Sequence, residues 1–527
     1  MSQYSLKVFS LISIVIGCIS LSSSKILRME SHTKRPSLEQ YNEMRAEYLN
    51  THLSRALGSD VLLNEEEQQF NTILMDLKAE ELARGFENPF NFTPARHFFD
   101  TIKSVESSQL FKLIHKMPKG AVLHAHDTAM CSTDYVVSLT KWDNLWQWGE
   151  IEGNDLPKFL FSRQKPEILN NIEWRPVKDV RKEMGDDVYD SKIRHFFTLI
   201  VDNPITYYND INVIWTKFED LFSVLGPIVF FIDAWKDYYR QSLQEMYDDG
   251  VNYLEFRGVL PELYDLDGNT YGPIETCRAY VDVLKEFRAS HPDFGCRFIY
   301  APRKYVDDDE FDTYIPTMIK LAKTFPEFMA GFDLVGQEDK SKPLVYYAEK
   351  LLQVPEDIQF FFHAGETNWM GTPSDENLID AVLLGSKRIG HGYAAVKYPH
   401  LLKIIKEKRI GIEVNPISNQ VLKLVDDLRN HPASIFFSDD YPIVISSDDP
   451  SFWGALPLTH DFYFAFLGIA SARQDLRTIK KLILNSFEFS TLNETQKAFA
   501  KQVWLKKWNR FIKEALKDYK SAILVQQ

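Results

Sequence analysis

From Ala121 onward, short apolar runs alternate with longer amphipathic segments along the chain. Runs of roughly 4–8 apolar residues are typical of strands that are buried on both faces of a parallel sheet. The pattern predicts eight β-strands, at Ala121–His126, Val251–Arg257, Cys296–Ala301, Phe328–Val335, Gln359–His363, Arg388–His391, Gly411–Val414 and Ile443–Ser447.

Helix-length segments such as Ile274–Ser290 and Leu378–Leu384 separate these runs. Alternation of this kind implies parallel strands that are joined by crossover helices. Eight units in succession therefore predict an α/β fold, a closed (β/α)8 TIM-like barrel. An open doubly wound sheet is the alternative, but no glycine-rich phosphate fingerprint follows the first strand, which disfavours it.

A helical extension precedes the barrel. Ser37 and Gln40 form a capping-box pattern, as do Asn64 and Glu67, and each pattern opens an amphipathic segment. Apolar residues recur on one face of the two segments at Tyr41, Met44 and Tyr48 and at Phe70, Ile73, Leu74 and Leu77. We expect an N-terminal helical region over 25–108 and the barrel over 109–527. The apolar stripes must pack either on the barrel or on a second subunit.

More than 100 residues separate the first two predicted strands, far more than one crossover needs. Residues of about 132–190 are rich in tryptophan and lack a regular hydrophobic period. We interpret them as an insertion between strands 1 and 2 that lies over the barrel mouth or beside it. An elaborate surface loop is the alternative.

The N-terminus has the build of a secretory signal peptide. Lys7 precedes an apolar run, Val8–Leu21, and three small residues end it at Ser24. The run is short for a bilayer span, which needs about 20 apolar residues, and no later stretch is long enough. We therefore expect removal of residues 1–24 and secretion to the extracellular space, with no membrane span. A buried helix or a membrane anchor is the alternative.

Composition adds limits on partners and cross-links. The formal net charge of −14 and the absence of a basic tract argue against a nucleic-acid partner. Removal of the signal peptide leaves three cysteines, Cys131, Cys277 and Cys296, so at most one disulfide can form within the chain. Cys277 with Cys296 is one candidate pair. Sequons at Asn91 and Asn493 suit a glycoprotein.

Polar residues cluster where the predicted strands end. His124 and His126 end the first strand two positions apart, so they point to the same side. The fifth strand ends at His363 with Glu366 three residues later, the sixth at His391, and the eighth before Asp448 and Asp449. The carboxyl ends of barrel strands converge on one face. Imidazoles and a carboxylate that meet there suit a zinc ion.

Each of these elements has an ordinary structural explanation when it is taken alone. Two histidines can simply pack, Asp-Asp-Pro is common in turns, and Glu366 could complement a helix dipole. His391 lies between two glycines and could belong to a tight turn. Coincidence at the same end of several strands is harder to explain in this way, so we favour a metal site.

These residues fall in motifs that resemble the adenosine deaminase superfamily, and more closely the secreted adenosine deaminase-related growth factors. The matching motifs are His124-Ala125-His126, His363-Ala364-Gly365-Glu366-Thr367, Arg388-Ile389-Gly390-His391-Gly392 and Ser446-Ser447-Asp448-Asp449-Pro450. The stretches Met117–Gly120 and Glu413–Gln420, the signal peptide and the helical extension also match the growth-factor branch. The resemblance covers nearly the whole mature chain.

The resemblance implies one zinc ion per subunit, which lowers the pKa of a water molecule that attacks the purine carbon bearing the amino group. Its implied ligands are His124, His126, His363 and Asp448. Glu366 would donate a proton to the adjacent ring nitrogen, which requires a raised pKa. His391 would orient the water and stabilise the charge that forms on it.

The resemblance also implies a substrate site. Asp449 and the backbone N–H of Gly336 would bind the purine, and Asp127 and Trp215 would contact the ribose. Some relatives carry a ribose-facing histidine near Arg303, which this chain lacks, so the contacts around Arg303 stay open.

We therefore predict a secreted zinc-dependent adenosine deaminase that converts adenosine, and 2′-deoxyadenosine, to inosine and ammonia. By lowering extracellular adenosine it would act as a growth factor. The expected partners are a second copy of the chain, bound through the helices of residues 36–84, and a cell-surface receptor or glycan at the insertion. The alternatives are an AMP deaminase and a receptor-binding signalling ligand with the barrel as scaffold.

Overall fold

The computed structural model describes residues 35–151, 156–167 and 173–526, so the expected signal peptide lies outside it. The chain divides into two compact units, one up to Leu53 and one from Ser54 onward. Helix α2, Leu38–Arg55, begins after Ser37 with the expected capping box, in which Ser37 Oγ accepts from the Gln40 N–H and Gln40 Oε1 from the Ser37 N–H. None of the residues of α2 is buried.

Eight parallel strands form the centre of the second unit in two four-stranded sheets, ordered β1-β5-β8-β9 and β10-β11-β12-β13. The first sheet holds β1 (Gly120–Val122), β5 (Val251–Gly258), β8 (Gly295–Tyr300) and β9 (Met329–Phe332). The second holds β10 (His363–Ala364), β11 (Arg388–His391), β12 (Gly411–Val414) and β13 (Ile443–Ile445).

Backbone bridges close the two sheets into a barrel. Phe332 pairs with Phe360 on one side, and Ala125 pairs with Asp448 on the other. At the second seam, the His126 N–H donates to the Asp448 carbonyl at 3.0 Å and the Asp448 N–H to the His124 carbonyl at 3.0 Å. The predicted (β/α)8 barrel is thus confirmed, and the seam itself brings His124, His126 and Asp448 together.

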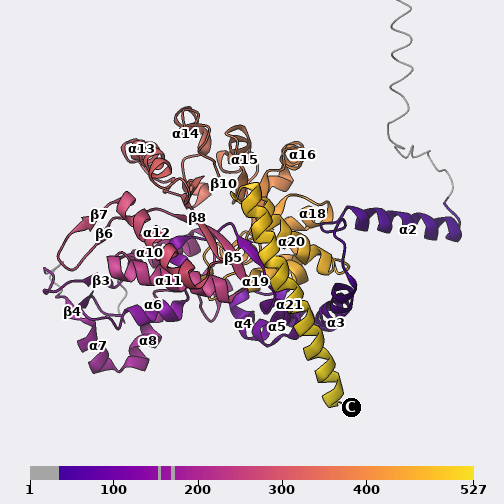
Figure 1. The fold of residues 1–527 in the computed structure, drawn as a ribbon, viewed down its shortest axis with the longest axis horizontal. Helices are drawn as coiled ribbons and strands as arrows, with labels where there is room; N and C mark the ends of the chain where they lie inside the picture. Colours follow the sequence, from indigo (N-terminus) through magenta and orange to yellow (C-terminus); the bar gives the residue numbers. More distant parts are fainter. Residues whose placement is uncertain (1–34, 152–155, 168–172, 527) are drawn as a thin grey trace, which may run out of the picture. The chain divides into compact units, whose positions relative to one another are not determined.

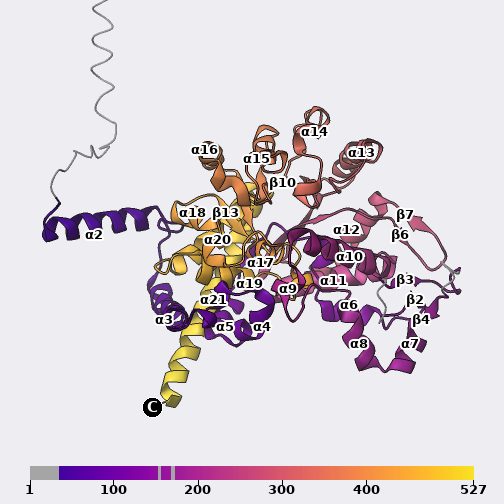
Figure 2. The same ribbon diagram turned by 180° about the vertical axis from the view of Figure 1, so that it is seen from behind.

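Helices surround the strands. Figures 1 and 2 show α13–α16 in a row outside β8 and β10. The helices of the barrel are α10 (Ile211–Val229), α11 (Ile232–Asp248), α12 (Pro273–Ser290), α13 (Asp308–Thr324), α14 (Leu344–Leu351), α15 (Pro373–Leu383), α16 (Pro399–Glu407), α17 (Pro416–Val421), α18 (Ala433–Ser438), α19 (Thr459–Phe464), α20 (Leu476–Glu488) and α21 (Glu494–Gln526).

The segment between β1 and β5 contains a small sheet of its own, ordered β3-β2-β4 and antiparallel. Both ribbon views show it at one side of the barrel with α7 and α8, next to α6. The elements are α6 (Thr133–Leu139), β2 (Leu145–Trp148), β3 (Lys158–Phe161), β4 (Arg175–Pro176), α7 (Val177–Met184), α8 (Asp186–Arg194) and α9 (Pro204–Tyr207). A hairpin of β6 (Leu263–Tyr264) and β7 (Thr270–Tyr271) follows β5.

The second predicted apolar stripe packs within its own chain. Helix α3, Glu65–Glu87, buries Phe70 and Leu74 completely, and the ring of Phe70 lies 5.2 Å from that of Phe511 in α21. Glu67 completes the capping box and also accepts from Trp508 Nε1 at 2.7 Å. Ile73 and Leu77 of the same stripe are partly buried against the same core, so the stripe packs mainly within its own chain. Helices α4 (Phe98–Ser107) and α5 (Gln109–His115) then lead into β1.

The candidate cysteine pair is not bridged. Cys131, Cys277 and Cys296 are free and buried, and Cys296 Sγ instead lies 3.4 Å from the Tyr239 hydroxyl. Within the described part of the chain, no helix has the length and apolar character to cross a membrane.

Candidate metal and active site

Five of the polar residues from the strand ends meet at the carboxyl end of the barrel. Nε2 of His124 and Nε2 of His126 lie 3.2 and 3.1 Å from the same oxygen, Oδ1 of Asp448. The rings of His124 and His363 are 4.6 Å apart between centroids, and His391 Nε2 lies 3.7 Å from Asp448 Oδ2. Ligand-capable atoms of His124, His363, His391 and Asp448 all lie within 4.8 Å of one another.

Two of these residues have left-handed backbone conformations, which residues other than glycine rarely adopt. His391 has φ of 61° and Asp448 has φ of 60°. Left-handed non-glycine residues of this kind are uncommon and tend to occur at functional sites.

Buried carboxylates orient two of the histidines. Asp333 Oδ2 lies 2.6 Å from His363 Nδ1, and Glu413 Oε2 lies 2.8 Å from His124 Nδ1. Arg257 joins the two carboxylates, with Nε 2.7 Å from Asp333 and one amine 2.6 Å from Glu413. A carboxylate on one ring nitrogen leaves the other free to face a metal, which is the usual arrangement around metal-binding histidines.

Burial and neighbouring charges keep Asp333 ionised and His363 neutral. Although burial favours the neutral acid, His363 and Arg257 hold the pKa of Asp333 well below its usual range. Burial lowers the pKa of His363 to about 3, so its imidazole is neutral and can act as a ligand.

Several buried polar atoms at this point have no partner among the described residues. They are His391 Nε2, Asp449 Oδ1 and Ser447 Oγ, whereas His124 Nε2 has the contact with Asp448 Oδ1 at 3.2 Å. Most buried polar atoms in proteins are paired, so an unpaired group requires an explanation. One of them, His391 Nε2, lies on a residue of the cluster whose ligand-capable atoms are within 4.8 Å of one another, which indicates that a ligand binds there.

Glu366 lies beside this cluster, with Oε1 3.5 Å from His391 Nε2. Burial raises its pKa well above the ordinary value, and the charges of Asp448 and Glu338 add to the rise. Glu338 also holds the backbone that follows β10, because its carboxylate accepts from the N–H groups of Gly365 and Glu366 at 3.1 and 2.6 Å. A buried, protonated carboxylic acid next to a metal site can act as a general acid.

The structure gives the surroundings of each predicted substrate-binding residue. Asp449 is buried beside the cluster, and burial together with Asp448 raises its pKa. Gly336 has φ of 118° and open space where a side chain would lie. Asp127 accepts from the Thr128 N–H through Oδ1 and from the Tyr280 hydroxyl through Oδ2. Trp215 is 7% exposed and packs edge-on against Phe218.

Sequence reasoning missed the residues that support this site. Arg257, Asp333, Glu413 and Ser418 are all buried, and Ser418 Oγ donates to Asp448 Oδ2 at 2.6 Å. A signal was available, because charged residues interrupt otherwise apolar strands at Glu255, Arg257 and Glu413. Charges are rarely buried without a partner, so such positions can be expected to pair inside a barrel.

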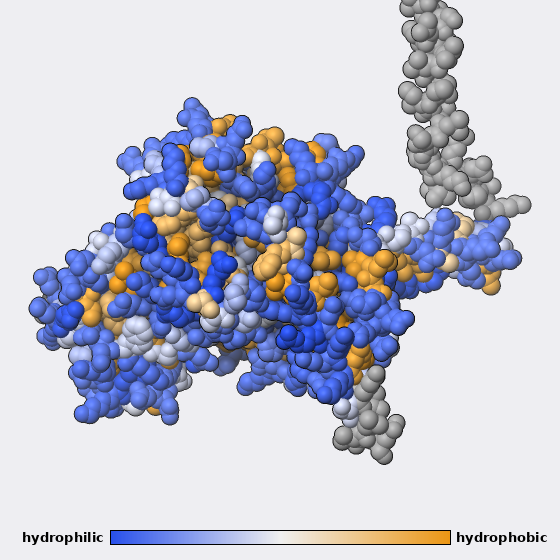
Figure 3. All heavy atoms as spheres, in the orientation of Figure 1, coloured by the Kyte–Doolittle hydropathy of each residue, from blue (hydrophilic) through white to orange (hydrophobic). Residues whose placement is uncertain are grey.

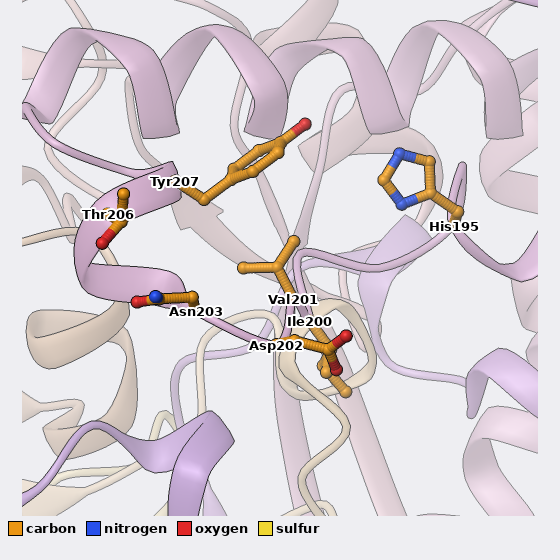
Figure 4. Close-up of a pocket in the computed structure, with 7 residues that line it drawn as sticks. All are labelled: His195, Ile200, Val201, Asp202, Asn203, Thr206 and Tyr207. Carbon is orange, nitrogen blue, oxygen red and sulfur yellow. The ribbon is translucent and has the colours of Figure 1, made fainter.

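Open surface pockets lie elsewhere. A pocket of about 500 Å³ is lined by residues from the stretch 195–207, where Figure 4 shows the ring of Tyr207 above Val201 and the ring of His195 to its right. Another, of about 620 Å³, lies between α15 and α16 and is lined largely by apolar side chains such as Leu383 and Leu401. Figure 3 shows hydrophobic surface among the helices of this region. Neither pocket includes a residue of the cluster.

The cluster and the barrel together allow comparison with known proteins. A family described as adenosine deaminase matches residues 201–503, and one described as adenosine/AMP deaminase N-terminal matches residues 15–114. The chain belongs to the adenosine deaminase family. It is 49% identical to an adenosine deaminase of Aedes albopictus over 92% of this chain and 91% of the relative. Its identity to human adenosine deaminase 2 is 37%, over 89% of this chain and 93% of the relative.

Solved structures support the fold of this family member. An adenine deaminase from Arthrobacter aurescens superposes with a TM-score of 0.51 at 16% identity, covering 75% of this chain and 99% of its own. An amidohydrolase from Burkhoderia ambifaria with bound Zn gives a TM-score of 0.54 at 17% identity, covering 77% and 94%. At these identities the likeness concerns the barrel alone.

Proposed function

We propose that this chain is a zinc-dependent adenosine deaminase that converts adenosine and 2′-deoxyadenosine to the inosine products and ammonia. The observation that carries the proposal is the meeting of His124, His363 and Asp448 with a buried acid, Glu366, at one end of the barrel. Family membership supports the reaction class.

The residues fit a zinc ion. Zinc prefers imidazole nitrogen and carboxylate oxygen, and the proposed ligands His124, His126, His363 and Asp448 supply three of the former and one of the latter. His124 Nε2 lies 3.2 Å from Oδ1 of Asp448, another proposed ligand, while Glu413 contacts its Nδ1. Bound zinc would lower the pKa of water and so provide a nucleophile at neutral pH.

The chain's own residues would handle the protons and the purine. Water adds its oxygen to the purine carbon, the bond from that carbon to the amino nitrogen breaks, and ammonia leaves. Glu366, kept protonated by burial, would donate its proton to the neighbouring ring nitrogen. One proton of the attacking water would return to Glu366, and the other would go to the amino group, which then leaves as ammonia. Asp449 and the Gly336 N–H would hold the ring, and His391 would stabilise the charge that forms on the attacking oxygen.

The structure favours a nucleoside over AMP as the substrate. A nucleotide site needs cationic or backbone donors for the phosphate, and Arg303 and Lys304 are the two basic residues that follow β8. Lys304 is fully buried and its amine donates to the His363 carbonyl at 3.2 Å, with Glu338 3.8 Å away. It is therefore occupied inside the protein.

An absorbance assay tests the proposal. The purified protein should deaminate adenosine and 2′-deoxyadenosine far faster than AMP, a chelator should abolish the reaction, and added zinc should restore it. Activity that survives complete removal of metal would contradict the zinc mechanism. Faster turnover of AMP would favour the alternative substrate.

We also propose secretion and a homodimer. The N-terminal pattern supports secretion, which the mature N-terminus of the exported protein would verify. For the dimer, α2 carries exposed Leu38, Tyr41, Met44 and Tyr48 along one face. Sedimentation should show a dimer for the wild type and a monomer for a variant with glutamate at Tyr41, Met44 and Tyr48. A dimer that survives these changes would exclude α2 as the main contact.

We also propose a growth-factor role, which would result from removal of adenosine, and a receptor or glycan partner that binds at the insertion. If removal of adenosine causes the growth effect, Glu366→Gln should abolish both deamination and the effect on cells. A variant that still stimulates cells without turnover would instead favour the signalling-ligand alternative and direct attention to residues 132–190.

A further inference from the structure

A chain of buried hydrogen bonds leads from the backbone of α18 to His391. It runs through His431 and Asn419, neither of which belongs to the proposed ligands or to the substrate-binding set. Asn419 lies on α17, directly after β12, and both residues are almost completely buried. The direction of each bond can be assigned, because one end of the chain is a group that can only donate.

The fixed end is the Ala433 N–H, which donates to His431 Nδ1 at 3.0 Å. His431 Nδ1 must therefore be the unprotonated nitrogen, since a proton there would face a second donor. Burial also lowers the pKa of His431 to about 3, so the ring is neutral and carries its one proton on Nε2. That Nε2–H then donates to Asn419 Oδ1 at 2.9 Å.

The orientation of the Asn419 carboxamide determines which nitrogen of His391 accepts a hydrogen bond. With its oxygen committed to His431, its Nδ2 faces His391 Nδ1 at 3.0 Å. An amide nitrogen can only donate, so His391 Nδ1 must accept. The Asn415 amide nitrogen lies 3.5 Å from the same atom. The proton of the His391 ring is thus placed on Nε2, which is buried, unpaired and 3.5 Å from Glu366 Oε1.

We propose that Asn419 and His431 are positioning residues that hold His391 in its Nε2–H tautomer, so that His391 donates a hydrogen bond to the attacking oxygen and does not remove its proton. The consequence for catalysis rests on the proposed deamination, whereas the tautomer itself does not. A histidine with its only proton on the inward nitrogen cannot act as a base there, and it can stabilise negative charge.

Asn419→Asp is the sharpest test, because it changes one NH₂ to an oxygen of nearly the same size. His431 can still donate to one carboxylate oxygen, while the other now accepts from His391 Nδ1. The tautomer should reverse. A histidine held in the wrong tautomer costs roughly 10⁴-fold in a serine protease, so we expect kcat to fall by about 10²–10⁴-fold with KM little changed.

Two matched variants of His431 test the proposal independently, in case Asn419→Asp fails to fold. His431→Gln can place an amide N–H where Nε2–H lies and should keep most of kcat, whereas His431→Leu removes the donor and should lower kcat. The tautomer is read directly from the ¹⁵N shifts of ring nitrogens in protein labelled at histidine, with His391 assigned by its loss in His391→Gln. Zinc content is measured for every variant.

A wild-type spectrum with the His391 proton on Nδ1 would overturn the proposal, as would Asn419→Asp with the reversed tautomer and undiminished kcat. Equal kcat in His431→Gln and His431→Leu would remove His431 from it. A wild-type protein with the Nε2–H tautomer but no deaminase activity would contradict the proposed function and leave the hydrogen-bond chain in place.

Discussion

Both ends of the barrel hold buried charged groups, but the two ends differ in whether these groups have hydrogen-bond partners within the protein. At the amino end, Lys119 precedes β1 and its amine donates to the carbonyls of His115, Met117 and Asp249 at 2.8–3.2 Å. The Asp249 side chain accepts from the N–H groups of Leu458 and Thr459 and from the Thr459 hydroxyl. This pair is therefore satisfied within the protein.

At the carboxyl end, comparable burial leaves atoms without partners. His391 Nε2 and Asp449 Oδ1 are shielded from solvent and unpaired among the described residues. An unpaired buried donor or acceptor costs about 1–3 kcal/mol. The comparison shows how a structural charge cluster differs from a functional one: the first is complete without a ligand, and the second is not.

Glu366→Gln should give the largest effect on the functional side of this comparison. The amide cannot donate the acidic proton, so turnover should fall by about 10²–10⁴-fold. Because Glu366 lies outside the proposed ligand set, zinc content and the unfolding midpoint should stay close to those of the wild type. A variant that retained more than about a tenth of the activity would show that Glu366 is not the proton donor.

Lys119→Met should give the largest effect on the structural side. The change removes the donor for three buried carbonyls and one partner of Asp249, so we expect a loss of about 3–5 kcal/mol in the free energy of unfolding. Denaturant unfolding measures this loss. In the folded fraction, kcat should be unchanged, and a comparable fall in kcat would mean that the two ends are coupled.

The barrel and the cluster of polar residues at its strand ends could be predicted from the sequence because both follow from local pattern. Apolar runs mark the strands, and His124, His363, His391 and Asp448 follow those runs directly. Convergence then follows from the closed parallel topology.

The supporting contacts could not be predicted, because they depend on relations between distant elements. Periodicity shows that Phe70 and Leu74 must be buried, but it does not show that α21 of the same chain covers them. The carboxylate of Asp127, which the resemblance places at the ribose, accepts from the hydroxyl of Tyr280, 153 residues away, and no local pattern predicts that contact. The direction of the Asn419 amide likewise depends on the Ala433 backbone.

Asp333→Asn should have a smaller effect than loss of Glu366, since it disturbs a ligand's orientation without removing the ligand. The amide cannot accept from both His363 Nδ1 and Arg257 at the same oxygen as well as a carboxylate does. Changes at such supporting residues lower metal affinity or activity by about 10–100-fold. Competition with a chelator measures the affinity, and Glu413→Gln, which supports His124, is the matched variant. Unchanged zinc affinity in both would show that the carboxylates are only structural.

Arg303→Ala should have the smallest effect, and it tests how far the functional region extends. Arg303 also lies at the carboxyl end, directly after β8, but its side chain is exposed, unlike that of its buried neighbour Lys304. Exposed substitutions away from specific contacts change free energies by at most about 0.5 kcal/mol, which is roughly twofold in kcat/KM. We expect kcat/KM for adenosine to stay within that range. If Arg303 instead held a phosphate, the variant would lose AMP turnover selectively and by far more than twofold. Measuring both substrates on the same preparation therefore decides whether the unpaired buried atoms alone define the site, or whether the exposed rim adds a second, charged subsite.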